Sequence, residues 1–278
     1  MTSPCHVLTP GPVQRSIRLA VLIYVLFLVA VPLVGLVHFS LAEGFGEFWD
    51  RLSEPVARAA LWLTIWTAVL VGGLNTLLGT ATAWVLVRYR IPARAMISAL
   101  VDLPLAIPTL VAGIMMVILY GPTSLIGRKV QVFDMEIAFA QPGIVLALLF
   151  VTLPFVVRAV EPVLLEVDPE EEEAAVILGA GPFQVFRTVF LPAIAPAAVS
   201  GGIRSLGRAL GEFGSIVIIA GNIPFKTLTA PVFIFGEIES GASLTAAAVS
   251  VVLLAFALAL HALARLAERH TGVRNVRT

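Results

Sequence analysis

The hydropathy pattern divides the chain into long apolar runs joined by shorter polar connections. A helix that crosses a bilayer needs about 20 apolar residues. Six runs meet that length, and they cover residues 17–38, 60–87, 95–120, 142–160, 192–220 and 244–266. The second, third and fifth runs are longer than a bilayer requires, so they are expected to tilt, kink or protrude. The pattern therefore predicts an all-α integral membrane protein with six transmembrane helices.

Prolines lie inside several of these runs, where they favour kinks because they remove a backbone donor. They are Pro32, Pro104, Pro108, Pro154 and Pro196. Composition supports a membrane environment, since 59% of the residues are hydrophobic and 13% are charged, against about 25% charged in a soluble domain. The formal net charge is zero, which gives no reason to expect a nucleic-acid partner.

The positions of Lys and Arg in the connections predict the orientation. One side of the predicted spans carries the larger group: Arg15, Arg18, Arg88, Arg90, Arg94, Arg158, Arg187, Arg265, Arg269, Arg274 and Arg277. The other side carries Arg51, Arg58, Arg128, Lys129 and Lys226. Since positive charge collects on the cytoplasmic side, both termini and the connection between the fourth and fifth spans are predicted to be cytoplasmic.

The first apolar run has two interpretations. Basic residues precede it and the small-residue sequence Ser40-Leu41-Ala42 follows it, as in a secretory signal peptide. Its apolar part is longer than the roughly 7–15 residues of a signal h-region, which favours a retained helix. The expected organisation is an N-terminal tail, first helix and external segment over residues 1–59, a core over 60–266 and a cytoplasmic tail over 267–278.

The polar connection between the fourth and fifth spans contains its own helix signals. Asp168 is suited to the N-cap and Pro169 to the first helical position, and Glu170 to Glu173 would lie where the helix dipole favours carboxylates. The Gly-Ala-Gly-Pro sequence at 179–182 is expected to end this helix, and a second short helix is expected over 183–190. From the caps alone, a simple linking loop and a docking helix remain equally open.

The spacing of the small residues in this connection favours the docking helix, through a resemblance to a known family. Glu173-Ala174-Ala175, Gly179, Val189 and Leu191-Pro192 form the pattern E-A-A-x3-G-x9-V-x-L-P. It resembles the cytoplasmic signature of binding-protein-dependent ABC transporter permeases, with Val189 in place of isoleucine. The resemblance implies a type I ABC importer permease fold and a cytoplasmic coupling helix that docks into a cleft on an ATPase. The residues implied in coupling are Glu172, Glu173, Ala174, Ala175, Gly179, Gly181, Leu191 and Pro192.

Further segments are similar to sulfate/thiosulfate ABC permease subunits of the T or U type. They cover residues 104–113, 119–121, 153–162, 208–215 and 219–222, and the resemblance extends over about 55–265. Molybdate permeases share the sequence at 210–214, so a molybdate or tungstate permease is the alternative. The segments 154–158 and 219–222 favour sulfate/thiosulfate.

Charged residues inside the fifth run carry two interpretations. Arg204, Arg208 and Glu212 are spaced by four and are expected on one helix face. Charges within a span are expensive and usually face the bundle interior or water. Together with Ser215 they are candidates for a translocation path or gate for an oxyanion, while an ion-pair network that locks the helices is equally compatible. Asp102 is expected to be a partner of another charge or a snorkelling residue.

The chain has no G-x4-G-K-[ST] phosphate loop, so any ATPase must be another chain. The resemblance implies two copies of an ATPase that bind ATP and Mg, a second homologous permease in a heterodimer, and a periplasmic sulfate-binding protein. No cofactor or metal is expected in this chain, and its four histidines lack metal-ligand spacing. A six-span intramembrane enzyme would need a paired nucleophile and base, for which Ser205 alone is poor support. A scaffold subunit without a path is the remaining alternative.

Overall fold

The computed structural model describes residues 12–270, and within that range it is helical without β-strands. Residues 1–11, with Cys5 and His6, and residues 271–278 lie outside the described residues, whereas residues 267–270 of the predicted C-terminal tail belong to the last helix. The helices are α1 Pro12–Ser40, α2 Phe45–Ser53, α3 Pro55–Arg88, α4 Arg94–Ala106, α5 Thr109–Tyr120, α6 Leu125–Gln131, α7 Gln141–Glu166, α8 Pro169–Ile177, α9 Pro182–Val185, the π-helix η1 Phe186–Phe190, α10 Leu191–Leu210, α11 Gly214–Ile219, α12 Ala230–Glu239 and α13 Ser243–His270.

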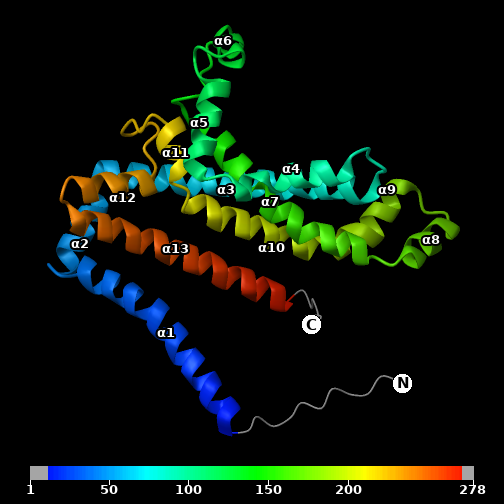
Figure 1. Cartoon of the computed structure of the whole chain (residues 1–278), viewed down its shortest axis with the longest axis horizontal. Helices are drawn as coiled ribbons and strands as arrows, with labels where there is room; N and C mark the ends of the chain where they lie inside the picture. The colour runs from blue at the N-terminus through cyan, green and yellow to red at the C-terminus, as the bar shows by residue number, and fades with distance from the viewer. Residues whose placement is uncertain (1–11, 271–278) are drawn as a thin grey trace.

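Five helical segments of the described chain are long and apolar enough to cross a membrane, and the number becomes six if α4 and α5 form one bent span. The five are α1, α3, α7, the continuous segment α9–η1–α10, and α13. Figure 1 shows α3, α7, α10 and α13 running along the long axis of the molecule. Helices α8 and α9 lie at one end of this axis and α2 and α12 at the other. The all-helical membrane fold that the sequence predicts is confirmed.

The centre of the fold is the packing of α3, α7 and α10. Val156 of α7, which is fully buried, lies between Gly79 of α3 and Gly201 of α10. A Cβ atom at Gly79 would lie 2.6 Å from the Cβ of Val156, and one at Gly201 would lie 2.9 Å from its Cα. Small residues at such crossings let helix backbones approach closely, which is how membrane helices gain packing energy without a hydrophobic driving force between them.

The same three helices share a buried polar cluster formed by Asn75, Thr152 and Ser205, all with no solvent exposure. The Asn75 amide Nδ2 donates to Thr152 Oγ1 at 2.8 Å and to Ser205 Oγ at 3.2 Å. The two hydroxyl oxygens of Ser205 and Thr152 are 2.9 Å apart. Because α3, α7 and α10 each contribute one side chain, these bonds fix the helices against one another.

The apolar run 95–120 does not form the straight span that hydropathy alone suggests. It is divided into α4 and α5, which meet at an angle of 112°. Ile107 has extended backbone geometry and Pro108 occupies the N-cap of α5. The break has a local cause, because the residue before a proline disfavours the α region and proline cannot donate a backbone hydrogen bond.

The expected bounds of the fifth span, 192–220, were wrong at both ends. The helical segment begins at Pro182 and ends at Leu210, where Gly211, Glu212 and Phe213 separate it from α11. Glu212 therefore lies beyond the helix that carries Arg204 and Arg208, and the three do not share one helix face. Hydropathy could not detect this end because residues 216–219 are as apolar as the helix before them.

Helix α1 diverges from the rest of the molecule in Figure 1 and packs against α13. Its side chains from Val13 to Phe39 are mostly exposed within this single chain, and none in its most apolar window is buried. An apolar helix without a protein cover is compatible with a lipid environment.

Candidate functional site

Helix α8 forms because both of its ends are capped as the sequence predicts. The Asp168 side chain accepts a hydrogen bond from the Glu170 backbone N–H at 3.0 Å. At the other end Gly179 adopts a φ of +85°, and its N–H bonds to the Val176 carbonyl while Ala180 N–H bonds to Ala175. This pair of bonds is the Schellman motif, in which a glycine at positive φ ends a helix.

The outer surface of α8 is unusual for a helix of a folded chain, since no residue of α8 is buried. Glu173 and Ala174 are exposed, and Glu173 makes no ion pair within residues 12–270. Ile177 is 84% exposed, Leu178 87% and Phe183, at the start of α9, 76%. Three large apolar side chains beside a free carboxylate at the end of the molecule form a surface suited to another protein.

The predicted second short helix does not end before the fifth span. Helix α9 continues through η1 into α10 with helical backbone angles throughout. The Leu191 N–H bonds to Phe186 O, five residues back, and Pro192 has no N–H. A proline removes one i→i−4 bond, so a local widening to the π form accommodates the lost donor. Leu191 and Pro192 thus lie at the junction between surface segment and span.

An ion pair that the sequence did not suggest links α8 to α3. Arg88, the last residue of α3, donates to both carboxylate oxygens of Glu172. The guanidinium carbon lies 4.6 Å from the ring centroid of Phe190 and 5.8 Å from that of Trp84. The residues of the pair are 84 positions apart, so no local spacing could have found it. Its only signal was a cation at the end of one predicted helix and a carboxylate at the start of another.

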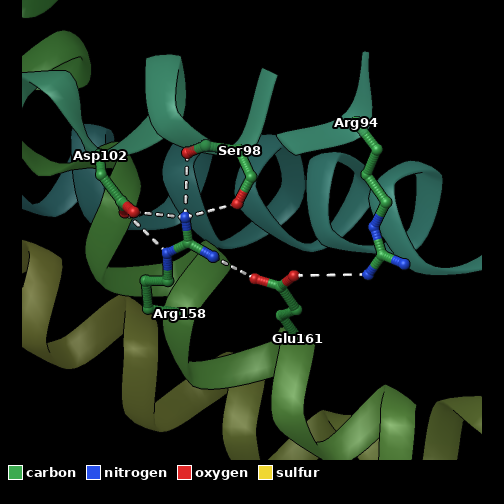
Figure 2. A network of polar contacts seen from close by, with 5 residues as sticks. All are labelled: Arg94, Ser98, Asp102, Arg158 and Glu161. Atoms are coloured by element: carbon green, nitrogen blue, oxygen red, sulfur yellow. Dashed lines mark hydrogen bonds and ion pairs between the residues drawn. The ribbon is translucent and has the colours of Figure 1, made fainter. Parts of the chain in front are cut away.

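A second cluster holds α4 against α7 and is shown in Figure 2. Arg158 of α7 donates through Nε to Asp102 Oδ1 at 2.6 Å and through Nη2 to Asp102 Oδ2 at 2.5 Å. The same Nη2 reaches the Ser98 carbonyl and hydroxyl, and Nη1 donates to Glu161. Arg94 completes the cluster, 3.7 Å from Glu161. Asp102 is therefore the partner of another charge, Arg158. This is one of the two alternatives that the sequence left open for it.

The candidate path residues lie around the end of α10. The Arg208 guanidinium is 2.6 Å from Glu212 Oε2, while Glu212 Oε1 accepts hydrogen bonds from the backbone N–H and the hydroxyl of Ser215, both at 2.9 Å. Glu212 is 2% exposed and Ser215 is fully buried, whereas Arg204 is exposed and has no ion pair in the described part of the chain. The structure thus joins Arg208, Glu212 and Ser215 and leaves Arg204 outside the network.

The fold defines an integral membrane protein that carries an exposed, capped helix at one end. Residues 75–273 match the family described as "Binding-protein-dependent transport system inner membrane component". Since this match covers more than half of the chain, the protein belongs to that family of membrane permeases. Its members are transport proteins, and the relatives below are named as permeases rather than enzymes.

Several curated proteins are similar over most of the chain. The probable sulfate transport system permease protein cysT of Chlorokybus atmophyticus is 41% identical over 85% of this chain and 83% of its own. The CysT protein of Synechococcus elongatus is 40% identical over 90% and 91%, and that of Escherichia coli 38% over 86% of each.

Solved structures agree on the fold. A chain of a bacterial alginate ABC transporter, in complex with an alginate pentasaccharide-bound periplasmic protein, matches with a TM-score of 0.76 at 17% identity, over 94% of this chain and 95% of its own. A chain of the MetNI methionine ABC transporter matches with a TM-score of 0.59 at 21% identity, over 79% and 97%. The protein has the type I ABC importer permease fold.

Proposed function

We propose that the chain is the membrane-spanning subunit of an ATP-driven importer of sulfate or thiosulfate. The observation that carries the ATP-driven part is the exposed surface of α8, on which Glu173, Ala174, Ile177 and Leu178 lie open. The anion is supported by relatives that are about 40% identical over most of their length and are named as sulfate transport permeases. Molybdate or tungstate was the alternative that the sequence left open, and the names of these relatives favour sulfate over it.

In the proposed assembly, two copies of an ATPase bind ATP and Mg and dock at α8, and a second, diverged permease completes the path. A periplasmic binding protein delivers the anion on the opposite side. The uneven distribution of Lys and Arg supports cytoplasmic termini. Closure of the ATPase pair would move α8, and the spans would rock between outward and inward access. The chain itself performs no covalent chemistry.

Transport by the complete complex tests this function. The chain is co-expressed with its partner permease, ATPase and binding protein, reconstituted in liposomes and supplied with radiolabelled sulfate. ATP-dependent uptake that unlabelled thiosulfate competes away is expected. Uptake of molybdate in preference to sulfate would assign the alternative substrate, and an intact complex that imports neither anion would contradict the proposal.

Glu173→Lys is expected to leave membrane insertion intact and to uncouple transport from ATP hydrolysis. The reversed charge would oppose the ATPase surface at an exposed position that makes no internal ion pair. We expect transport to fall at least about tenfold, which corresponds to about 1.4 kcal/mol of lost coupling. Gly179→Asp should act similarly, because its φ of +85° strains any L side chain.

Gly46→Asp is the matched control for the glycine variant. Gly46 lies in the first turn of α2, outside the coupling segment; it is exposed, its φ is not positive, and a Cβ there would meet no atom within 4 Å. It should therefore transport like the unmodified chain, while Gly179→Asp does not. Normal transport by either Glu173→Lys or Gly179→Asp, measured per inserted permease, would remove α8 from the coupling role.

Arg208→Ala is expected to lower uptake if the network at the end of α10 lines the path. The change would leave the buried Glu212 carboxylate without its cation, and an unpaired buried anion repels an oxyanion. Arg204→Ala tests the unpaired, exposed guanidinium separately. Uptake is measured against membrane level for each variant. Unmodified rates in both would assign the network to helix locking instead of the path.

A further inference from the structure

Helix α8 is held by few packing contacts, although the proposed function requires it to transmit force. None of its residues is buried, and its backbone neighbours are α9 and η1. A cavity of about 300 Å³, lined in part by Trp84, Arg88, Glu172 and Val176, separates it from the end of α3. A helix supported this way can change its angle about its ends unless a directed interaction fixes it.

The interaction between Arg88 and Glu172 crosses this gap and joins two helix ends of opposite partial charge. Arg88 is the last residue of α3 and Glu172 lies in the first turn of α8. A cation at a helix C-terminus and a carboxylate at an N-terminus are each stabilised by the helix dipole. Nη2 of Arg88 donates to both carboxylate oxygens of Glu172, and such a charge-assisted contact holds the two helix ends at a short distance.

The guanidinium of Arg88 is itself held in place by aromatic rings. It lies over Phe190 of η1, and Trp84 stands one turn earlier on α3. The Trp84 ring meets Phe186 and Phe190 edge-on, at centroid distances of 5.0 and 4.9 Å. Phe190 is 2% exposed. Arg88 is therefore supported by a rigid group that belongs to two spans, and stacking favours arginine over lysine in this role.

We propose that Arg88 is a positioning residue that ties the docking helix to span α3 through Glu172, so that movement of α8 is passed directly to the α3–α7–α10 bundle. The proposal rests on the proposed function. It separates the neighbouring carboxylates by role: Glu173 is exposed and makes no ion pair in the described chain, which leaves it available to a partner, whereas Glu172, with a side chain 32% exposed, is paired inside the chain. Glu172 then contributes to coupling without contacting the ATPase.

A charge-swap experiment in the reconstituted full complex tests this assignment. Arg88→Glu and Glu172→Arg are made singly and together, and the measured quantity is sulfate imported per ATP hydrolysed. Each single variant should lower this ratio by about 2- to 30-fold, the range in which residues along a coupling route act. The double variant should recover part of the lost ratio, because it restores an ion pair at the same place. Recovery should be incomplete, because the swapped charges oppose both helix dipoles and a carboxylate gains nothing from the Phe190 ring.

Two matched controls separate the pair from general charge effects. Glu166→Arg alters a carboxylate at the end of α7, outside the docking helix, and Arg90→Glu alters a cation two residues beyond Arg88; both side chains are exposed and make no ion pair in the described chain. Both controls should keep the unmodified ratio. If Arg88→Glu impairs folding, Arg88→Gln replaces it, because glutamine keeps a planar polar group without the charge. It should lower the ratio of sulfate imported to ATP hydrolysed in the same direction.

A spin-label distance between Ile177 on α8 and Val85 on α3, both exposed in this chain, provides a readout independent of transport. The distance distribution should broaden in Arg88→Glu and narrow again in the double variant. Unchanged ratios and distances in the single variants, or no rescue in the double variant, would overturn the proposal. Loss of ATPase binding by Glu172→Arg that the second change does not repair would make Glu172 a docking residue instead.

Failure of the proposed function gives a different result. In that case the unmodified complex would import no sulfate, or Glu173→Lys would retain full coupling, whereas the distribution of Ile177–Val85 distances would still broaden in Arg88→Glu and narrow in the double variant.

Discussion

Gly79→Leu is expected to lower the thermal stability of the protein, because it would overpack the crossing of α3 and α7. The Cβ of a residue at 79 would lie 2.6 Å from Val156 Cβ and 2.8 Å from its Cγ1. Val156 cannot retreat, because its backbone also faces Gly201 at the distance of direct contact. Overpacking of this kind costs about 1–3 kcal/mol, and occasionally more. We expect the apparent melting temperature in detergent to fall by about 5–10 °C.

Gly73→Leu is the control for that variant. Gly73 lies on the same helix, is exposed, and a Cβ there would meet nothing within 4 Å. The added side chain and the change in hydropathy are the same, so only the packing differs. Fluorescence-detected gel filtration after heating compares the two. Equal melting temperatures would mean that α3 does not cross α7 at Gly79 as closely as described.

Arg158→Glu is expected to release α4 from α7. The variant would place a third carboxylate beside Asp102 and Glu161, where the guanidinium now donates to both. Removing one partner of a fully buried ion pair costs about 3–5 kcal/mol. The side chains of Arg158 and Asp102 are 33% and 45% exposed, so we expect about 2 kcal/mol here. This corresponds to about 30-fold faster amide hydrogen exchange along α4.

Arg94→Glu serves as the comparison within the same cluster. Its ion pair with Glu161 is longer, 3.7 Å, and the Arg94 side chain is 44% exposed. The exchange rate of α4 should change by less than about fivefold. Hydrogen exchange followed by mass spectrometry resolves α4 from α7. If Arg158→Glu leaves the exchange of α4 unchanged, the cluster does not fasten this helix.

The sequence predicts the features that depend on nearby residues. The caps of α8 at Asp168 and Gly179 are set within a few positions, and the structure confirms both. The apolar runs likewise predicted the helical membrane fold, because a spanning helix must satisfy its own backbone. The pattern at 173–192 indicated a surface helix only through its resemblance to a known family, and α8 has no buried residue in the structure.

What the sequence could not predict depends on positions far apart in the chain. The Arg88–Glu172 pair and the Arg158–Asp102 pair join residues 84 and 56 positions apart. Their geometry follows from how α3, α4 and α7 cross, which hydropathy does not encode. The ends of the fifth span were also missed, because the π-turn before Pro192 prolongs the helix backward and the break at Gly211 interrupts an otherwise apolar stretch.

The hydrogen bonds among Asn75, Thr152 and Ser205 limit how the molecule can deform. Sliding one of the three helices by a single turn, about 5.4 Å, would separate these groups and leave buried polar atoms without their hydrogen-bond partners, which is costly. Rotating α3, α7 and α10 together would break none of them. We therefore expect the bundle to move as one rigid body, and the breaks at Pro108, between α4 and α5, and at Gly211, after α10, to let the segments beyond them change direction relative to it.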